Sequence, residues 1–240
     1  MTKEQKQMAH VGSMAAVVVG ILYVVVAVTH MLIPMAQRAA VGDGHGFYQS
    51  FSQDPTFSLI EWWALGILSL FAIAVVLAVH ERFVSLHAGW VRWASGLALL
   101  GYGVTAILEF TSLGRHPVFA AAYAAGDPST QAAIAAQSGL PVDGYGVLRF
   151  GAVAFWALVI SVLILRSQTM PRLFGYLGLG SALAMLILVA GFILGEEMLI
   201  VAGAAVGGVL FAPAWFIWLG LLLRREGEPA MSARPAVSVG

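Results

Sequence analysis

Six stretches of this chain run for more than twenty residues each with no more than two charged side chains, and no other feature limits the fold as much. An α-helix of about 20 apolar residues crosses the hydrocarbon core of a bilayer. A membrane β-barrel would need segments of about ten residues with alternating polarity, whereas these runs are continuous. The sequence therefore predicts an all-α, polytopic bundle of six transmembrane spans, at residues 13–36, 57–80, 90–113, 144–166, 172–195 and 198–223.

Composition leads to the same class. Hydrophobic residues make up 60% of the chain and charged residues only 10%, whereas soluble domains carry about 25% charged residues. The formal net charge is zero, so nothing indicates a nucleic-acid partner. Cysteine is absent, which excludes disulfides and thiolate metal sites. The first apolar run is too long for the core of a signal peptide, so we expect a retained span.

The distribution of lysine and arginine predicts the orientation, because cytoplasmic segments carry the excess of these residues. With the N-terminus inside, three of the twelve fall on the outer side, namely Arg38, Arg115 and Arg149. The other nine fall on the cytoplasmic side: Lys3, Lys6, Arg82, Arg92, Arg166, Arg172, Arg224, Arg225 and Arg234. We therefore expect both termini to be cytoplasmic.

We expect residues 1–225 to form a single membrane domain and residues 226–240 to be a disordered cytoplasmic tail, since that tail is polar and rich in proline and small residues. The long third loop contains a predicted short helix. Asp127 is its expected N-cap, Pro128 its first residue, and Gly139 follows its end. It either lies over the outer mouth of the bundle or simply connects two spans.

Four ionisable side chains on four different spans share one depth. His30, Glu61, Glu109 and Arg149 each lie four to six residues from an outer span end, which at 1.5 Å per residue is about 6–9 Å. Glu109 also ends a stripe of small and polar residues at helical spacing on the third span, which includes Tyr102. Such stripes face the bundle interior or a water-filled cavity.

This layer has two interpretations. His30, Glu61, Tyr102, Glu109 and Arg149 could line an outward-facing polar pocket that binds a ligand. Alternatively, a carboxylate paired with Arg149 could be a structural bracket near the headgroups, where the energetic penalty for burying a charge falls. Two carboxylates close together would share a proton or a cation.

The chain offers little to support a cofactor. A histidine with two glutamates could bind a metal, but no HExxH motif is present, and we predict neither a metal site nor any cofactor. Haem is disfavoured because His30 lies near the outer side whereas His10, His80 and His87 lie near the inner side.

Small residues crowd the last two spans. Gly203 and Gly207 form a small-xxx-small pair, and three more glycines stand at the start of the fifth span. Close helix packing within the bundle is the simpler interpretation, and a homodimer or a protein partner held through spans five and six is the other.

The stretch LILRSQTMPRLFGYLGLGSALAML, residues 163–186, resembles the junction between spans four and five in a broad family of uncharacterised bacterial membrane proteins. APAWFIWLGLLLRR, residues 212–225, is similar to that family's closing helix. The family is known as a domain of unknown function. The resemblance thus implies a six-span fold and a bacterial cytoplasmic (inner) membrane, and it transfers no catalytic residue.

Together these features lead to three hypotheses. The first is a membrane protein that binds a small polar or amphiphilic ligand, a lipid headgroup or a cation, in the outward-facing pocket, with membrane lipids as its other partners. The second is a non-catalytic interaction subunit of a membrane complex. The third is a membrane-embedded enzyme that uses a metal or a carboxylate pair.

Overall fold

The structure is a computed structural model that describes residues 3–38, 43–138 and 143–227, and these parts contain helices and no strands. Six helical segments are long and apolar enough to cross a membrane, which confirms the predicted all-α, six-span fold. They comprise α1 (Lys3–Leu32), α3 (Thr56–Phe83), α4 (Ala88–Ala125), η2 (Val147–Gly151) with α6 (Ala152–Ser167), α7 (Arg172–Leu194), and α8 (Glu197–Gly203) with η3 (Ala204–Phe211) and α9 (Ala212–Gly227).

Three shorter helices lie between the spans: η1 (Met35–Gln37), α2 (Gly44–Gln53) and α5 (Pro128–Ser138). The predicted loop helix is confirmed as α5, in which the Asp127 carboxylate accepts a hydrogen bond from the Thr130 N–H at 2.8 Å. Its expected terminator, Gly139, and residues 228–240 of the expected tail lie outside the described residues. Residues 226 and 227 of that tail are still helical, as the end of α9.

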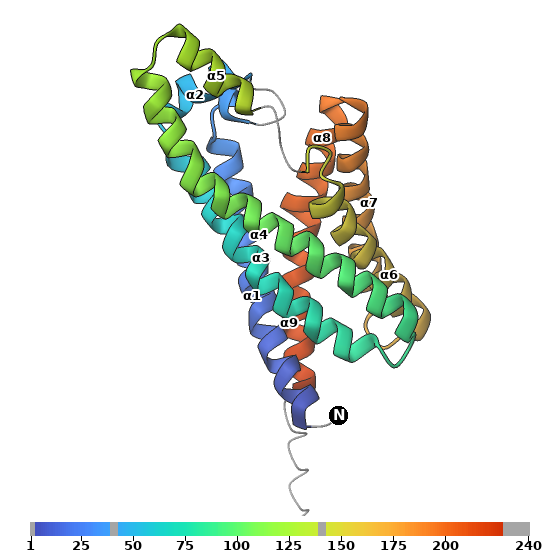
Figure 1. Cartoon of the computed structure of the whole chain (residues 1–240). Coiled ribbons are helices and arrows are strands. Elements are labelled where there is room, and N and C mark those ends of the chain that lie inside the picture. The colour runs from blue at the N-terminus through green and yellow to red at the C-terminus, as the bar shows by residue number, and fades with distance from the viewer. Residues whose placement is uncertain (1–2, 39–42, 139–142, 228–240) are drawn as a thin grey trace, which may run out of the picture.

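The bundle has two distinguishable ends. α1 begins and α9 ends at the same end, and α2 and α5 lie at the opposite one, which we call the distal end (Figure 1). The charge distribution predicts that the distal end faces away from the cytoplasm. Many large apolar side chains are exposed around the bundle, as expected for a surface in contact with lipid, among them Ile21, Ile107, Leu173, Ile193 and Leu210.

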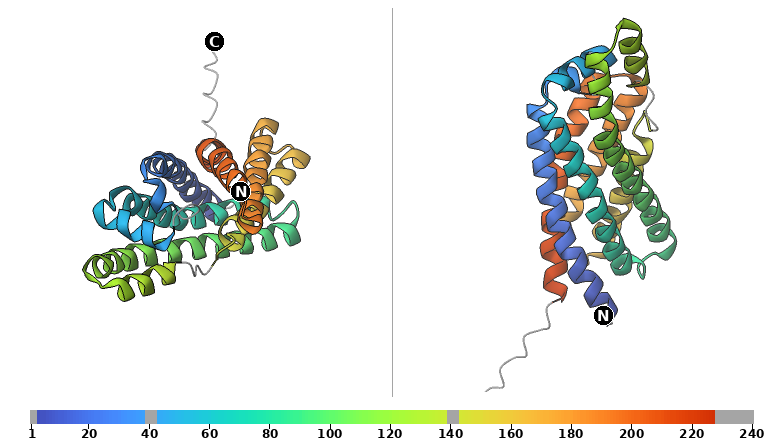
Figure 2. Two further views of the ribbon diagram at one scale, coloured as in Figure 1. Left: turned by 90° about the horizontal axis from the view of Figure 1, so that it is seen from above. Right: turned by 60° about the vertical axis from the view of Figure 1, so that its left-hand side comes forward.

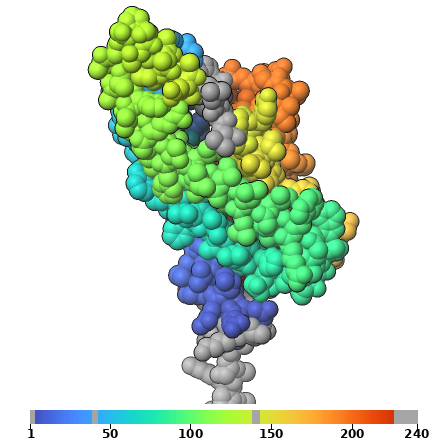
Figure 3. All heavy atoms as spheres, viewed as in Figure 1, coloured from blue at the N-terminus to red at the C-terminus, as the bar shows by residue number. Residues whose placement is uncertain are grey.

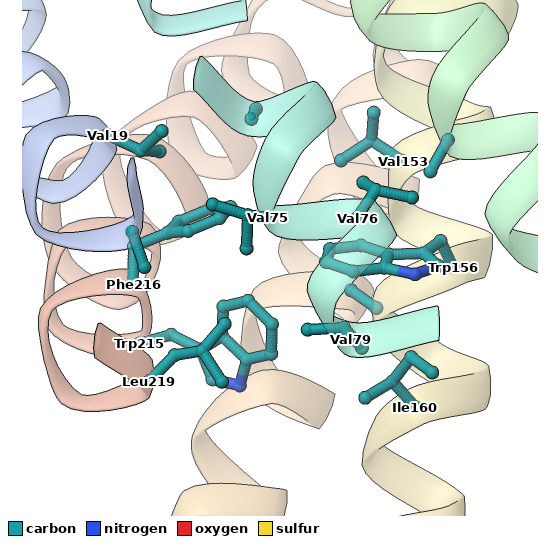
Figure 4. Packing of buried hydrophobic residues seen from close by; sticks show 14 of the residues in the cluster. Val19, Val75, Val76, Val79, Val153, Trp156, Ile160, Trp215, Phe216 and Leu219 are labelled. Carbon is teal, nitrogen blue, oxygen red and sulfur yellow. The ribbon is translucent and has the colours of Figure 1, made fainter. Parts of the chain in front are cut away.

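The main core joins α1, α3, α4, α6, α7 and α9 around two tryptophans. Trp156 of α6 and Trp215 of α9 are almost fully buried, and their rings meet edge to face with centroids 5.7 Å apart. Valines of α3, including Val75 and Val79, fill the space around them (Figure 4). A bilayer supplies little hydrophobic driving force between helices, so this close packing is what holds the spans together.

The first and last helices lie side by side (Figure 2). The Ser13 hydroxyl donates to the Gly220 carbonyl oxygen at 2.8 Å. A Cβ at Gly20 would lie 3.1 Å from the Pro213 carbonyl oxygen, and one at Gly220 would lie 2.9 Å from the Ser13 carbonyl oxygen. Glycine at these two positions therefore allows the backbones of α1 and α9 to approach closely.

Pro213 stands inside the last span, as the second residue of α9. The structure shows the widened π-helical turns of η3 directly before this proline. Proline lacks an N–H and its ring clashes with the preceding turn, and widening of that turn relieves both problems.

A second, smaller core lies at the distal end. It joins α2, α5 and the last turns of α4. Its buried members are Tyr48, Phe51, Ala120, Tyr123 and Ile134. α4 reaches this core because it continues through Pro117 to Ala125, beyond residue 113 where the predicted third span ends.

The buried Gln37 side chain connects this distal region to α3. Its amide donates to the Ser50 hydroxyl at 2.9 Å and to the Asp54 carbonyl oxygen at 3.0 Å. Its own oxygen accepts from the Ser58 hydroxyl at 2.7 Å. The amide of Gln37 thus fixes the chain between α1 and α3.

Candidate functional site

Four of the five predicted site residues form two pairs, each of an acidic and a basic side chain. His30 Nδ1 lies 3.1 Å from Glu61 Oε1, which joins α1 to α3. Arg149 Nη1 lies 3.6 Å from Glu109 Oε1, which joins η2 to α4. Glu61 and Glu109 are also close enough to interact electrostatically. The four side chains therefore form one series across four helical segments, which we call the ion chain.

Close helix crossings bring the members of the ion chain together. Gly66 leaves room for the Phe110 ring, so that α3 and α4 pack tightly next to Glu109. A Cβ at Gly101 would lie 2.7 Å from the Leu148 carbonyl oxygen, so only glycine lets η2 approach α4 this closely. Both contacts place Glu109 between α3 and the π-helical segment that carries Arg149.

Asp143 holds the backbone of the segment that carries Arg149. Its carboxylate accepts hydrogen bonds from the backbone N–H of Leu148 at 3.3 Å and of Arg149 at 2.9 Å. These N–H groups belong to the first turn of η2, where no helical carbonyl can accept from them. The cap therefore fixes the start of the fourth span and, through it, the direction of the arginine.

Exposure differs along the ion chain. The Glu109 side chain is 7% exposed and that of Glu61 13%, whereas those of Arg149 and His30 are 25% and 50% exposed. Both carboxylates are thus held inside the bundle and both basic groups reach its surface. Water or lipid headgroups can contact the arginine and the histidine directly.

Arg149 has hydrogen-bonding capacity to spare. A guanidinium has five N–H donors in a planar fork and commonly binds a carboxylate through two of them. Here its contact with Glu109 is single and long, and its Nε is buried without a hydrogen-bond partner in the described chain. The guanidinium also lies over the Phe150 ring, 4.6 Å from the centroid. The ion pair therefore leaves donors free for another anionic group.

Tyr102, the fifth predicted site residue, lies away from the ion chain. It is on the same face of α4 as Glu109 but two turns further from the distal end, and it is buried in the main core. Its hydroxyl interacts with that of Tyr23, although the distance and angles between the two groups are not those of a regular hydrogen bond. The structure thus gives Tyr102 different neighbours from the other four residues.

Sequence reasoning missed a group of histidines and tyrosines at the distal end. His116 Nδ1 lies 3.1 Å from the Tyr48 hydroxyl, and His45 Nδ1 lies 3.1 Å from that of Tyr123. Burial raises the pKa of Tyr48, and the charge of Arg115 opposes this effect. Two turns separate His116 from Glu109, so a longer predicted third span would have placed it on the stripe of Glu109.

The structure also bears on two other features raised by the sequence, a possible metal site and the glycine pair of the last span. In the described parts of the chain, no group of three or more His, Asp or Glu side chains is placed to hold a metal ion. In the last span, Gly203 and Gly207 pack against Ala184 of α7, as the simpler packing interpretation expects.

Comparison with known proteins gives one match. A family model described as "Domain of unknown function (DUF4386)" matches residues 18–222. No curated protein and no solved structure matches the chain.

Proposed function

Because the chain belongs to the DUF4386 family, whose description names no activity, we propose from the ion chain that this membrane protein binds the headgroup of a zwitterionic lipid at its distal end. The single observation that carries the proposal is the incompletely paired Arg149 beside two carboxylates. A phosphate would accept from the free guanidinium donors, and an ammonium group would lie against Glu61 and Glu109.

The balance of charge supports a ligand that carries both signs. Glu61, Glu109 and Asp143 bring three carboxylates into this region, against one full positive charge from Arg149 and the imidazole of His30. Carboxylates near a low-dielectric interior interact strongly with a cationic group. An anion alone would meet repulsion from the carboxylates, and a cation alone would leave the arginine donors unused.

The surroundings support an amphiphilic ligand. Large apolar side chains are exposed on the same elements, including Ile60 on α3, Ile107 on α4 and Leu148 on η2, and acyl chains can pack against them. Figure 3 shows a hollow beside the distal part of α4, with blue atoms from the N-terminal part of the chain visible at its floor.

The location of the protein is part of the proposal. We propose the cytoplasmic membrane of a bacterium, with both termini in the cytoplasm and the ion chain near the outer leaflet. The nine-to-three distribution of lysine and arginine supports the orientation.

The test is native mass spectrometry of the protein in mild detergent with defined lipids. The wild type is expected to retain phosphatidylethanolamine in preference to phosphatidylglycerol, which lacks the ammonium group. Glu109→Gln and Arg149→Gln are expected to lose this preference. Glu196→Gln is the matched control, because it makes the same change at an exposed position at the start of α8, also near the distal end.

Three outcomes would contradict parts of the proposal. Equal retention of both lipids by the wild type would show that Glu61 and Glu109 do not bind the ammonium group. Unchanged retention in folded Glu109→Gln and Arg149→Gln would make the pair a structural bracket and favour the interaction subunit. Elemental analysis of the same samples tests the enzyme alternative, since a metal retained by the wild type and lost in His30→Ala would favour it.

One observation favours the interaction subunit. A groove with about 190 Å³ of free space runs between α7 and the last span, lined by small and aliphatic residues that include Gly180, Ala184 and Val206. A helix of a protein partner or of a second copy could pack there. Site-specific cross-linking from position 206 in native membranes would identify that neighbour.

A further inference from the structure

A small cavity lies inside the main core, apart from the ion chain, between α4, α6, α7 and α9. Its lining includes Tyr102, Trp156, Gly178, Ser181 and Trp215. It leaves about 10 Å³ for the centre of a water molecule. That is the smallest space that holds one water, for which about 10–15 Å³ is needed.

Polar atoms without partners lie in or next to this cavity. The indole nitrogens of Trp156 and Trp215 are buried and make no hydrogen bond within the described chain. The same holds for the hydroxyl of Ser161, which lies next to Gly178. All three residues are at most 3% exposed. Buried polar groups normally have a protein or water partner, because leaving them unpaired costs free energy.

Ser161 differs from other buried hydroxyl residues in the same bundle. Ser69 and Thr105 each donate to the carbonyl oxygen four residues earlier, at 2.8 and 2.9 Å. This is the usual way in which a helix satisfies such a group. The Ser161 hydroxyl makes no such bond, so its hydrogen-bonding capacity is available next to Gly178, which lines the cavity.

Gly178 marks the point where two of these groups converge. A Cβ at this position would collide with Ser161 Oγ and would lie 2.6 Å from Trp215 Nε1. Two groups this close to a single point are within reach of one water, since each hydrogen bond spans about 2.8–3.0 Å. The glycine hydrogen leaves open the space that a methyl group would fill.

We propose that this cavity is a binding site for a single water molecule that joins α6 and α9 beside Gly178 of α7. The Trp215 indole N–H can only donate, so the occupant must accept a hydrogen bond from it. A water can accept from this N–H and donate to the Ser161 hydroxyl. The space admits nothing larger. This proposal is independent of the lipid site at the distal end.

The test is nuclear magnetic resonance of protein with ¹⁵N-labelled tryptophan in deuterated detergent. The Trp215 indole signal is assigned from its loss in Trp215→Phe. In the wild type we expect a cross peak between this indole proton and water, with the sign of a long-lived contact. Gly178→Ala is expected to abolish the peak because its methyl group fills the site.

Gly103→Ala is the matched control, because it adds the same methyl group to α4 where no atom lies within 4 Å. Its spectrum should keep the water cross peak. Should Gly178→Ala fail to fold, Ser161→Ala provides the second variant, which keeps the space and removes one partner, so the peak should weaken. The absence of a cross peak in the wild type, or its persistence in folded Gly178→Ala, would overturn the proposal.

Discussion

Removal of the Gln37 side chain should loosen the distal end more than any exposed substitution there. The amide makes three hydrogen bonds, with the Ser50 hydroxyl, the Asp54 carbonyl oxygen and the Ser58 hydroxyl. A typical intramolecular hydrogen bond contributes about 1 kcal/mol to stability. We therefore expect Gln37→Ala to lower the free energy of unfolding by about 3 kcal/mol, because all three bonds are lost.

Of the three hydrogen bonds, the one with Ser58 should account for the largest share of the lost stability. Ser50 is partly exposed and can bond to water instead, whereas Ser58 is 2% exposed and would be left without an acceptor. Ser58→Ala removes that stranded hydroxyl. The double variant Gln37→Ala/Ser58→Ala should thus be scarcely less stable than Gln37→Ala alone, since the two side chains share one interaction.

Thermal unfolding in detergent, followed by tryptophan fluorescence, measures the effect. For a chain of this length about 1 kcal/mol shifts Tm by roughly 2–4 °C, so Gln37→Ala should lower Tm by roughly 6–12 °C. Gln49→Ala is the control, since this neighbouring glutamine on α2 is exposed. An equal shift in both variants, or strictly additive losses for Gln37→Ala and Ser58→Ala, would refute the reasoning.

Three further outcomes are expected. Trp156→Ala should destabilise the protein by about 3–5 kcal/mol through the cavity it leaves, measured as the loss in Tm. A double-mutant cycle on Glu109 and Arg149, followed by the same unfolding assay, should give a coupling free energy of about 1–3 kcal/mol, and a value near zero would show that the pair contributes nothing. Hydrogen bonds from Thr130, of which the one from its backbone N–H has the largest effect, lower the pKa of Asp127 from its usual 3.8. The ionised cap therefore stabilises α5 above pH 3.8, and this stabilisation is lost as the pH falls through the lowered pKa. Hydrogen exchange of the Thr130 amide should accelerate over the same pH range.

The spans were predictable because their signal is local. Each apolar run contains enough information to specify a membrane helix, and the charge of the loops adds an orientation. The shared depth of His30, Glu61, Glu109 and Arg149 could likewise be counted along the chain. The position of α5 followed from the N-cap preference of Asp127.

The pairing within the ion chain was not predictable, because it depends on how each helix is rotated. Arg149 lies in a π-helical turn, and such a turn changes the angle between successive side chains, so that helical spacing no longer predicts its direction. Its approach to α4 depends on Gly101, far away in the sequence. Tyr102 shares a helix face with Glu109, yet two turns are enough to give it different neighbours.

The length of α4 was missed for a different reason. A proline inside a pattern normally indicates that a helix ends before it, and Pro117 follows shortly after the predicted end of the third span at residue 113. The helix continues because packing against α2 and α5 in the distal core offsets the lost hydrogen bond.

The pairing of α1 with α9 has a consequence for how the protein is made. The hydrogen bond between Ser13 and Gly220 joins residues 207 positions apart. At about 5–20 residues per second, the ribosome needs roughly 10–40 s to synthesise the chain between them. During synthesis the first helix enters the bilayer with the face that carries Ser13 and Gly20 not yet covered by the last helix, so lipid occupies that face until the last helix arrives.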